Sequence, residues 1–203
     1  QGRVLLIDSG ATCLGYGSDI TRTWTTAAAE PVFRQLVAGV DALQQKLCAM
    51  VKPGLSYVEI QNATHRMVGD LLHSAGVIKL GGEEAFRRGI TGVFFPHGVG
   101  HFLGIQVHDV SGRQKAPEGG VVPPPTHSPY LRTTRTITEG QVFTIEPGLY
   151  FIEMLLRPHR KGPESAQFDW GLIDRLAPCG GIRIEDNVVV TKDGHRNLTR
   201  PHI

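Results

Sequence analysis

Four carboxylates stand where short apolar segments would otherwise continue: Asp8, Asp19, Glu146 and Glu185. An ionised carboxylate in such a setting is costly unless a cation or a proton compensates its charge. Because a carboxylate interrupts an apolar segment at four separate places, we expect the four residues to share one binding partner. Oxygen-rich groups of this kind are the donors that hard divalent metal ions prefer.

The two aspartates are predicted to face each other across a hairpin. A turn between Cys13 and Leu14 places residues whose numbers sum to 27 opposite one another, and Asp8 and Asp19 meet this condition. Directly opposed side chains have Cβ atoms about 4.5–5.5 Å apart. Two like charges there are destabilising unless a cation lies between them or one is protonated. A β-bulge would shift this register.

The two glutamates are predicted on strands whose other face is apolar. Side chains alternate along a strand, which places Thr144 and Glu146 on one side of the first segment. The same rule places Arg183, Glu185 and Asn187 on one face of the later segment. Both strands would therefore present a carboxylate on a polar face.

Histidines flanked by glycine add nitrogen donors to this set. The run His97–His101 has the sequence His-Gly-Val-Gly-His, and His108 follows it. Gly98 and Gly100 permit tight backbone geometry, which suits an imidazole held at the edge of a core. Four carboxylates and one imidazole fit Mn²⁺ better than a thiophilic ion, with zinc and cobalt left open. They also balance two divalent ions, which in paired sites lie about 3.5–4 Å apart and activate a bridging water.

Each of these residues also has a purely structural interpretation. Asp8 beside Ser-Gly is typical of a turn, and Asp19 could pair with Arg22. The two glutamates could mark a strand end and an exposed turn. His65 and His73 fall on a predicted helix, where a core or surface role is the simpler interpretation. The metal hypothesis therefore rests on the combination of residues and on no single one.

The elements that would carry these residues divide into early helices and flanking strands. Strands are predicted over Arg3–Ile7, Tyr16–Thr25, Val142–Glu146 and Gly181–Val190. Helices are predicted over Pro31–Val51, between Ser56 and Gly76, and over Glu83–Arg88. The Pro- and Gly-rich stretch Ser111–Pro129 is predicted to be a long ordered loop. This order favours an α+β fold over a doubly wound sheet.

Composition bounds the function classes. The chain has 203 residues, 21 Lys plus Arg against 19 Asp plus Glu, and a net charge of +2. This balance argues against nucleic acid or an anionic membrane as the main partner. Cys13, Cys48 and Cys179 are odd in number and form no CxxC pair, which favours a reducing compartment such as the cytoplasm. No apolar run approaches the ~20 residues that span a bilayer.

As a set, five segments resemble the metallopeptidase family with the pita-bread fold, which includes methionine aminopeptidase, aminopeptidase P and prolidase. The segments are Leu5–Ala11, Ser18–Thr23, His97–His101, Thr144–Tyr150 and Gly181–Asp186. Three more are similar to the bacterial Xaa-Pro dipeptidase (prolidase) group: Phe94–Val110, Ser128–Arg135 and Leu149–Glu153. The resemblance implies a curved antiparallel sheet covered by helices. It also implies that residues 1–203 are a C-terminal catalytic domain, truncated at its N-terminus, of a homodimeric parent.

The resemblance further implies a role for each matching residue. Asp19 and Glu185 would bridge two metal ions, Asp8 would bind one ion, and His101 and Glu146 would bind the other. Glu146 would also shuttle protons as a metal-bridging hydroxide attacks the peptide carbonyl.

Three further residues would contact the substrate in this family. His108 would contact the carbonyl or the tetrahedral intermediate. His97 would line the pocket for the proline or its carboxylate. Arg183 would hold a carboxylate of the substrate or of a neighbouring side chain.

The implied reaction is hydrolysis of the peptide bond before proline in Xaa-Pro dipeptides. Proline lacks an N–H, so peptidases that grip this group act poorly there. An aminopeptidase P that acts on longer peptides is the nearest alternative, and hydrolysis of organophosphate esters stays open as a side activity. A binding module or fragment without activity, or a metal-free creatinase-like hydrolase, belongs to a different class. Binding modules and creatinase-like hydrolases typically lose metal ligands, whereas all five are present here. Inactivity of the truncated chain itself stays open, because the missing N-terminal elements normally contribute to the site.

Overall fold

The computed structural model describes residues 3–116 and 118–203 of the chain. The helices of this part are α1 Pro31–Met50, α2 Tyr57–Ser74, α3 Gly82–Arg87, α4 Thr91–Phe94, α5 Glu153–Arg160 and α6 Trp170–Leu176. The strands are β1 Val4–Ser9, β2 Thr12–Cys13, β3 Tyr16–Gly17, β4 Ile20–Thr25, β5 Gln114–Ala116, β6 Gly119–Val121, β7 Val142–Ile145, β8 Gly148–Tyr150, β9 Gly181–Arg183, β10 Asp186–Val190 and β11 His195–Asn197. Short 3₁₀ helices span Ser165–Gln167, Ala177–Cys179 and Arg200–His202. Antiparallel strands beside helices confirm the predicted α+β class.

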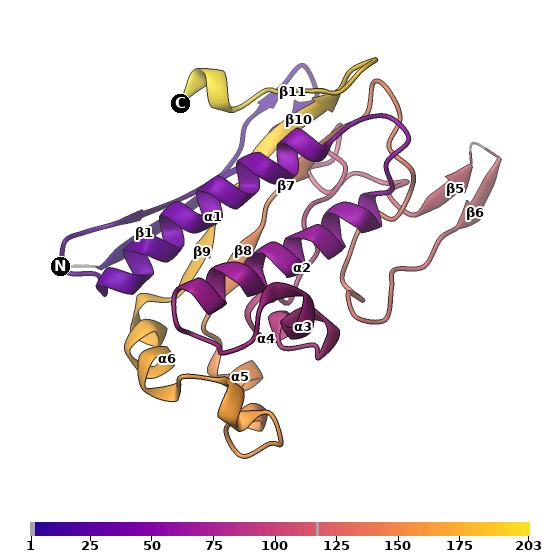
Figure 1. Cartoon of the computed structure of the whole chain (residues 1–203). Coiled ribbons are helices and arrows are strands. Elements are labelled where there is room, and N and C mark those ends of the chain that lie inside the picture. The colour runs from indigo at the N-terminus through magenta and orange to yellow at the C-terminus, as the bar shows by residue number, and fades with distance from the viewer. Residues whose placement is uncertain (1–2, 117) are drawn as a thin grey trace.

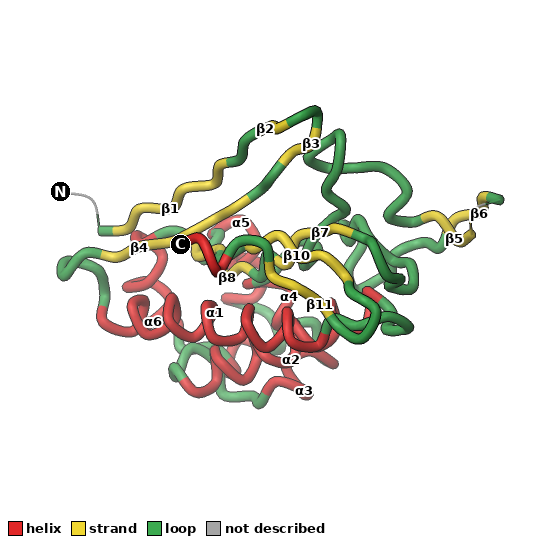
Figure 2. The backbone as a smooth tube through the Cα atoms, turned by 90° about the horizontal axis from the view of Figure 1, so that it is seen from above, coloured by secondary structure: helices red, strands yellow, loops and turns green. Residues whose placement is uncertain are grey.

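Helices α1 and α2 form a layer on one side of the strands (Figures 1 and 2). Both helices agree with the predicted segments to within two residues. The Ser56 hydroxyl caps α2 by accepting a hydrogen bond from the Val58 amide at 3.3 Å. The buried side of α1 repeats at three- and four-residue steps, and its apolar members include Phe33, Leu36, Val40, Leu43 and Leu47. These side chains join the main core between the helices and the strands.

The strands that matter for the site form three antiparallel groups. β1 pairs with β4, β8 pairs with β9, and β10 lies between β7 and β11. Strands from the two ends of the sequence meet because β4 packs against both β9 and β10. This arrangement brings carboxylates that are far apart in the chain to one side of the strands.

The register of the first hairpin differs from the prediction. Paired residues sum to 29 and not to 27, so Asp8 lies opposite Thr21 and the predicted direct pairing of Asp8 with Asp19 is wrong. The turn occupies Leu14 and Gly15, whose φ angles are 51° and 87°, as in the turns that match the twist of a hairpin. A shift of two residues preserves the face of every side chain, so the aspartates still point to the same side.

The predicted strand over Gly181–Val190 is also interrupted. Ile184 and Glu185 lie outside regular strand, and β9 and β10 on either side of them pair with different neighbours. Among the described residues, no helix is both long and apolar enough to cross a membrane.

Candidate metal centre

All five predicted ligands gather at one place in the structure. Three overlapping groups have donor atoms within 4.8 Å of one another: Asp8, Asp19 and Glu185; His101, Glu146 and Glu185; Asp19, His101 and His108. Their positions follow from the strand ends: β1 carries Asp8, Asp19 precedes β4, Glu146 follows β7, and Glu185 lies between β9 and β10. The sixth member, His108, lies near the same cluster.

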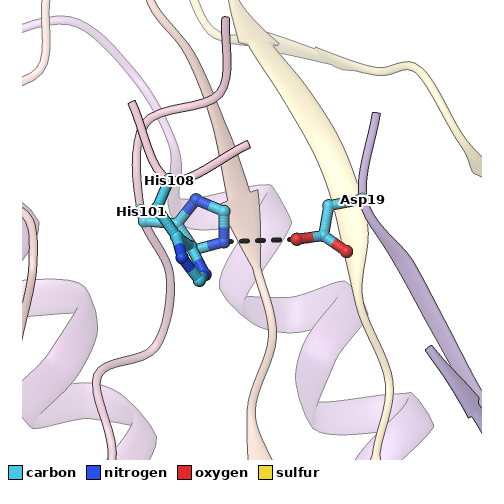
Figure 3. A group of neighbouring side chains, drawn as sticks. All are labelled: Asp19, His101 and His108. Atoms are coloured by element: carbon cyan, nitrogen blue, oxygen red, sulfur yellow. Dashed lines mark ion pairs between the residues drawn. The ribbon is translucent and has the colours of Figure 1, made fainter. Parts of the chain in front are cut away.

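His101 directs one ring nitrogen at the carboxylates. Its Nε2 lies 3.5 Å from Asp19 Oδ2 and 3.5 Å from Glu146 Oε1. Nδ1 lies 2.9 Å from the Phe102 carbonyl oxygen, to which it donates. A backbone acceptor at Nδ1 fixes the tautomer that leaves an Nε2 lone pair for a cation. Figure 3 shows His101 facing Asp19, with the His108 ring beside it, and the two ring centroids are 4.4 Å apart.

Close backbone packing holds the histidine segment against β7. The Glu146 amide donates to the Val99 carbonyl at 2.8 Å, and the Thr144 amide donates to the His101 carbonyl at 2.9 Å. A Cβ atom at Gly100 would lie 2.0 Å from the Thr144 carbonyl oxygen, which no real side chain tolerates. The close approach of the two backbones therefore requires glycine at position 100, as its place between Val99 and His101 in the motif indicates.

The carboxylates carry more negative charge than their neighbours balance. Burial raises the pKa of Glu185 to about 8, and repulsion from Glu146 adds to the effect. Burial also raises the pKa of Glu146 to about 7, with a contribution from Asp19, although His101 and Arg183 act in the opposite direction. A site in which burial and mutual repulsion hold protons on carboxylates is a site that a divalent cation would stabilise.

Arg183 joins the cluster through Asp8 and through two residues that the sequence analysis did not single out, Thr21 and Tyr150. Its guanidinium pairs with the Asp8 carboxylate, and its Nη1 and Nε donate to the hydroxyls of Tyr150 at 3.0 Å and Thr21 at 3.2 Å. The Thr21 hydroxyl in turn donates to Glu185 Oε2 at 2.6 Å. Thr21 and Tyr150 both lie inside the family-like segments, which was the one available signal for them.

Two clefts open on either side of the cluster. One has a volume of about 380 Å³ and is lined by His97, His108, Arg113, Tyr130, Arg132, Glu146 and Arg183, among others. The other has a volume of about 410 Å³ and is lined by Asp8, Asp19, Val107, His108 and the backbone of the first hairpin. His108 borders both clefts, and the first cleft contains arginines at positions 113 and 132 that the sequence analysis did not identify.

Comparisons with known proteins agree with this geometry. The model of "Metallopeptidase family M24" matches residues 1–192. An Xaa-Pro dipeptidase of Marinobacter nauticus is 53% identical over 98% of this chain and 44% of its own length. An Xaa-Pro dipeptidase of Aeromonas hydrophila is 47% identical over 96% of this chain and 44% of its own length. The chain thus spans less than half of the relatives it matches.

Solved structures give the same result for the fold. A zinc-substituted Escherichia coli aminopeptidase P in complex with product matches with a TM-score of 0.71 and 29% identity over 98% of this chain and 38% of that chain. A proline aminopeptidase P II from Yersinia pestis matches with a TM-score of 0.70 and 29% identity over 98% of this chain and 39% of that chain. The predicted pita-bread catalytic fold is confirmed, and the chain belongs to metallopeptidase family M24.

Proposed function

We propose that this chain carries the catalytic site of an Xaa-Pro dipeptidase that depends on two divalent metal ions. The observation that carries the proposal is the convergence of four carboxylates and one imidazole between two clefts. The donor set fits the ions: five residues with oxygen or imidazole donors, no thiol, and an excess of negative charge. Mn²⁺ suits these donors best, while cobalt or zinc would fit as well.

Within this proposal each ligand has a specific place. Asp8, Asp19 and Glu185 would hold one ion, and His101, Glu146, Asp19 and Glu185 the other. Asp19, Glu185 and His101 each belong to two of the three groups of neighbouring donors, and of these only the two carboxylates have a second oxygen with which to bridge. The ions, when bound, would polarise the substrate carbonyl and lower the pKa of an attacking water.

Glu146 is suited to move the proton of that water. It is half-buried and borders the cationic cleft, the one that Arg113, Arg132 and Arg183 line. A carboxylate with a raised pKa accepts a proton from the attacking water and returns it to the leaving amine near neutral pH. His108 borders both clefts, so it would lie beside the scissile carbonyl and donate a hydrogen bond to its oxygen.

The charges of the two clefts would orient a dipeptide. The cleft with His97, Arg113, Arg132 and Arg183 would take the prolyl residue, because guanidinium groups bind a terminal carboxylate. Asp8 and Asp19 would face the free amine in the other cleft. The substrate carboxylate would then lie on the prolyl side of the scissile bond, as a dipeptide requires.

The likeness to aminopeptidase P supports a second candidate, removal of the first residue from longer peptides. Competition between Ala-Pro and a tripeptide such as Ala-Pro-Ala separates the two activities. We further propose that residues 1–203 are the catalytic part of a longer protein, since the relatives are more than twice as long as the matched region. The C-terminal place of this part, and a homodimeric and cytoplasmic parent, are proposed from the family resemblance alone.

The test is hydrolysis of Ala-Pro by the purified chain with Mn²⁺ and after chelation, with Ala-Ala as the control substrate. We expect Mn²⁺-dependent cleavage of Ala-Pro, little cleavage of Ala-Ala, and no activity in Asp19→Ala. Cleavage that persists after exhaustive chelation, or that does not prefer proline, would contradict the proposal.

A further inference from the structure

A stripe of polar side chains crosses the buried face of helix α2, beneath the cationic cleft. Its members are Tyr57, Gln61 and His65, and their four-residue spacing places them on one face of the helix. Their exposed fractions are 0%, 0% and 2%, in the middle of the apolar core. Buried polar groups need partners, and most of the partners here belong to segments that line the site.

Gln61 contacts both walls of the cleft. Its Oε1 accepts a hydrogen bond from the Val99 amide at 2.7 Å. Its Nε2 donates to the His97 carbonyl at 3.2 Å and lies 3.1 Å from the Ser128 hydroxyl. His97 lies in one wall, and Ser128 opens the segment that supplies Pro129, Tyr130 and Arg132 to the other.

The contact with Val99 reaches the candidate metal centre. Val99 is bonded on both sides, because its amide donates to Gln61 and its carbonyl accepts from the Glu146 amide. The same stripe supports β7, the strand that precedes Glu146, because the Tyr57 hydroxyl donates to the Thr144 carbonyl at 2.7 Å. A displacement of the Gln61 amide would therefore move His97 and Glu146 together.

His65 fixes the far end of the network. Its Nε2 lies 3.1 Å from the Ser128 hydroxyl, and its Nδ1 lies 3.0 Å from the Thr91 hydroxyl. A neutral ring suits these contacts, since the Gln61 amide nitrogen also lies 3.2 Å from Nε2 and can only donate. Ser128 is thus held by two side chains of α2 and is itself buried.

We propose that Gln61 is a positioning residue, whose side-chain amide sets the placement of His97 and Glu146 relative to the wall that begins at Ser128. The substrate role of the cleft rests on the proposed function, whereas the placement of its walls can be measured without it. Without such a role the polar stripe would only lower stability, because apolar residues of similar size would fill the same space with no polar groups to desolvate.

The test compares Gln61→Met with Gln44→Met in the Mn²⁺-loaded chain. Gln44 is the control, because it is equally buried on α1 but touches neither residues 97–101 nor residues 127–132. It donates to the Ile145 carbonyl and to Cys48 Sγ and accepts from Arg200, so it supports the peptide before Glu146 from the side opposite the cleft walls. Hydrogen exchange by mass spectrometry reports on residues 97–101 and 127–132. We expect exchange there to be about tenfold faster in Gln61→Met and unchanged in Gln44→Met, at a similar loss of thermal stability.

Kinetics with Ala-Pro give the second readout. We expect KM to rise about tenfold in Gln61→Met and in Ser128→Ala, with kcat lowered only in Gln61→Met because only that change releases Val99 and Glu146. Ser128→Ala also keeps the test decisive if Gln61→Met fails to fold. Equal exchange in the two glutamine variants, or looser walls with an unchanged KM, would overturn the proposal. A chain that cleaves no Ala-Pro would refute the proposed function. The comparison of hydrogen exchange between Gln61→Met and Gln44→Met would still show whether Gln61 holds the walls of the cleft in place.

Discussion

Two adjacent acidic residues, Glu185 and Asp186, are equally buried but have opposite electrostatic surroundings. Asp186 is fully buried and accepts hydrogen bonds from Arg22, Arg200 and Asn197. Burial acts to raise its pKa, but the bonds from Arg200, Asn197 and Arg22 outweigh it and hold the pKa below the usual value. Asp186 is thus a structural carboxylate whose compensating cations are part of the chain.

Glu185, one residue earlier, has no such compensation. The Thr21 hydroxyl donates to it, while its charged neighbours include the carboxylates of Glu146, Asp19 and Asp8. Burial alone therefore does not distinguish a functional acid from a structural one. The balance of charge does: a buried carboxylate with its own arginines stabilises the fold, and one that faces other carboxylates calls for a cation from outside the chain.

Neutralising Glu185 should have the largest effect on metal binding and activity. In Glu185→Gln we expect fewer than two bound metal ions and a loss of Ala-Pro hydrolysis of at least about 1,000-fold, because the ions supply several kcal/mol of transition-state stabilisation. Asp19→Ala should behave in the same way. Metal content is measured by mass spectrometry after dialysis. Two ions retained by either variant would refute the bridging roles of Asp19 and Glu185.

Neutralising the neighbour should act on the fold. Asp186→Ala leaves Arg22 and Arg200 without their shared partner and should lower the free energy of unfolding by about 3 kcal/mol, at the low end for a buried ion pair because both arginines are partly exposed. Urea unfolding of the chelated chain measures the effect. Asp193→Ala, an exposed change in the same half of the chain, is the control and should stay within about 0.5 kcal/mol. Equal effects would show that the ion pairs contribute nothing.

The two residues should also give stability opposite dependences on pH. Glu185 and Glu146 have raised pKa values, so the folded chelated chain holds protons that the unfolded chain releases above about pH 4.5. Its stability should therefore fall as pH rises from 5 to 8, by at most about 1.4 kcal/mol per pH unit for each group. The pKa of Asp186 is lowered, so its contribution is lost only in acid, below the usual pKa of 3.8. Thermal unfolding with and without Mn²⁺ tests this, and a decline that Glu185→Gln does not flatten would contradict it.

The sequence predicted which residues gather at the candidate site better than it predicted the geometry that joins them. Carboxylates and a glycine-flanked histidine in apolar segments identified the residues that now lie together, because such side chains are rare there without a purpose. The predicted register that paired Asp8 with Asp19 was wrong by two residues. The prediction that both side chains point to one face still held, because an even shift keeps each side chain on its face.

Other features could not be predicted from one sequence. At Ile184 and Glu185 the chain passes from pairing with β8 to pairing with β7, and no local sequence pattern reveals this change of partner. Helix α5 is eight residues long, contains Pro158 and has Leu156 as its one buried residue, and a proline inside a short, largely exposed segment argues against a helix there. Thr21 carries a hydroxyl on a strand of threonines, and only the folded structure distinguishes it from Thr23.

The difference between Thr21 and Thr23 predicts the smallest of the expected effects. The Thr21 hydroxyl links Arg183 to the Glu185 carboxylate, so Thr21→Val should weaken metal binding about tenfold by freeing a ligand from its supporting contact. The Thr23 hydroxyl exchanges hydrogen bonds with the Arg183 backbone at 3.0 and 3.1 Å. Thr23→Val should therefore lower stability by about 1 kcal/mol and leave metal affinity nearly unchanged. Calorimetric titration with Mn²⁺ compares the two variants. Equal weakening would mean that metal affinity depends on the packing of β4 against β9, and the hydroxyl beside Glu185 would then have no separate role.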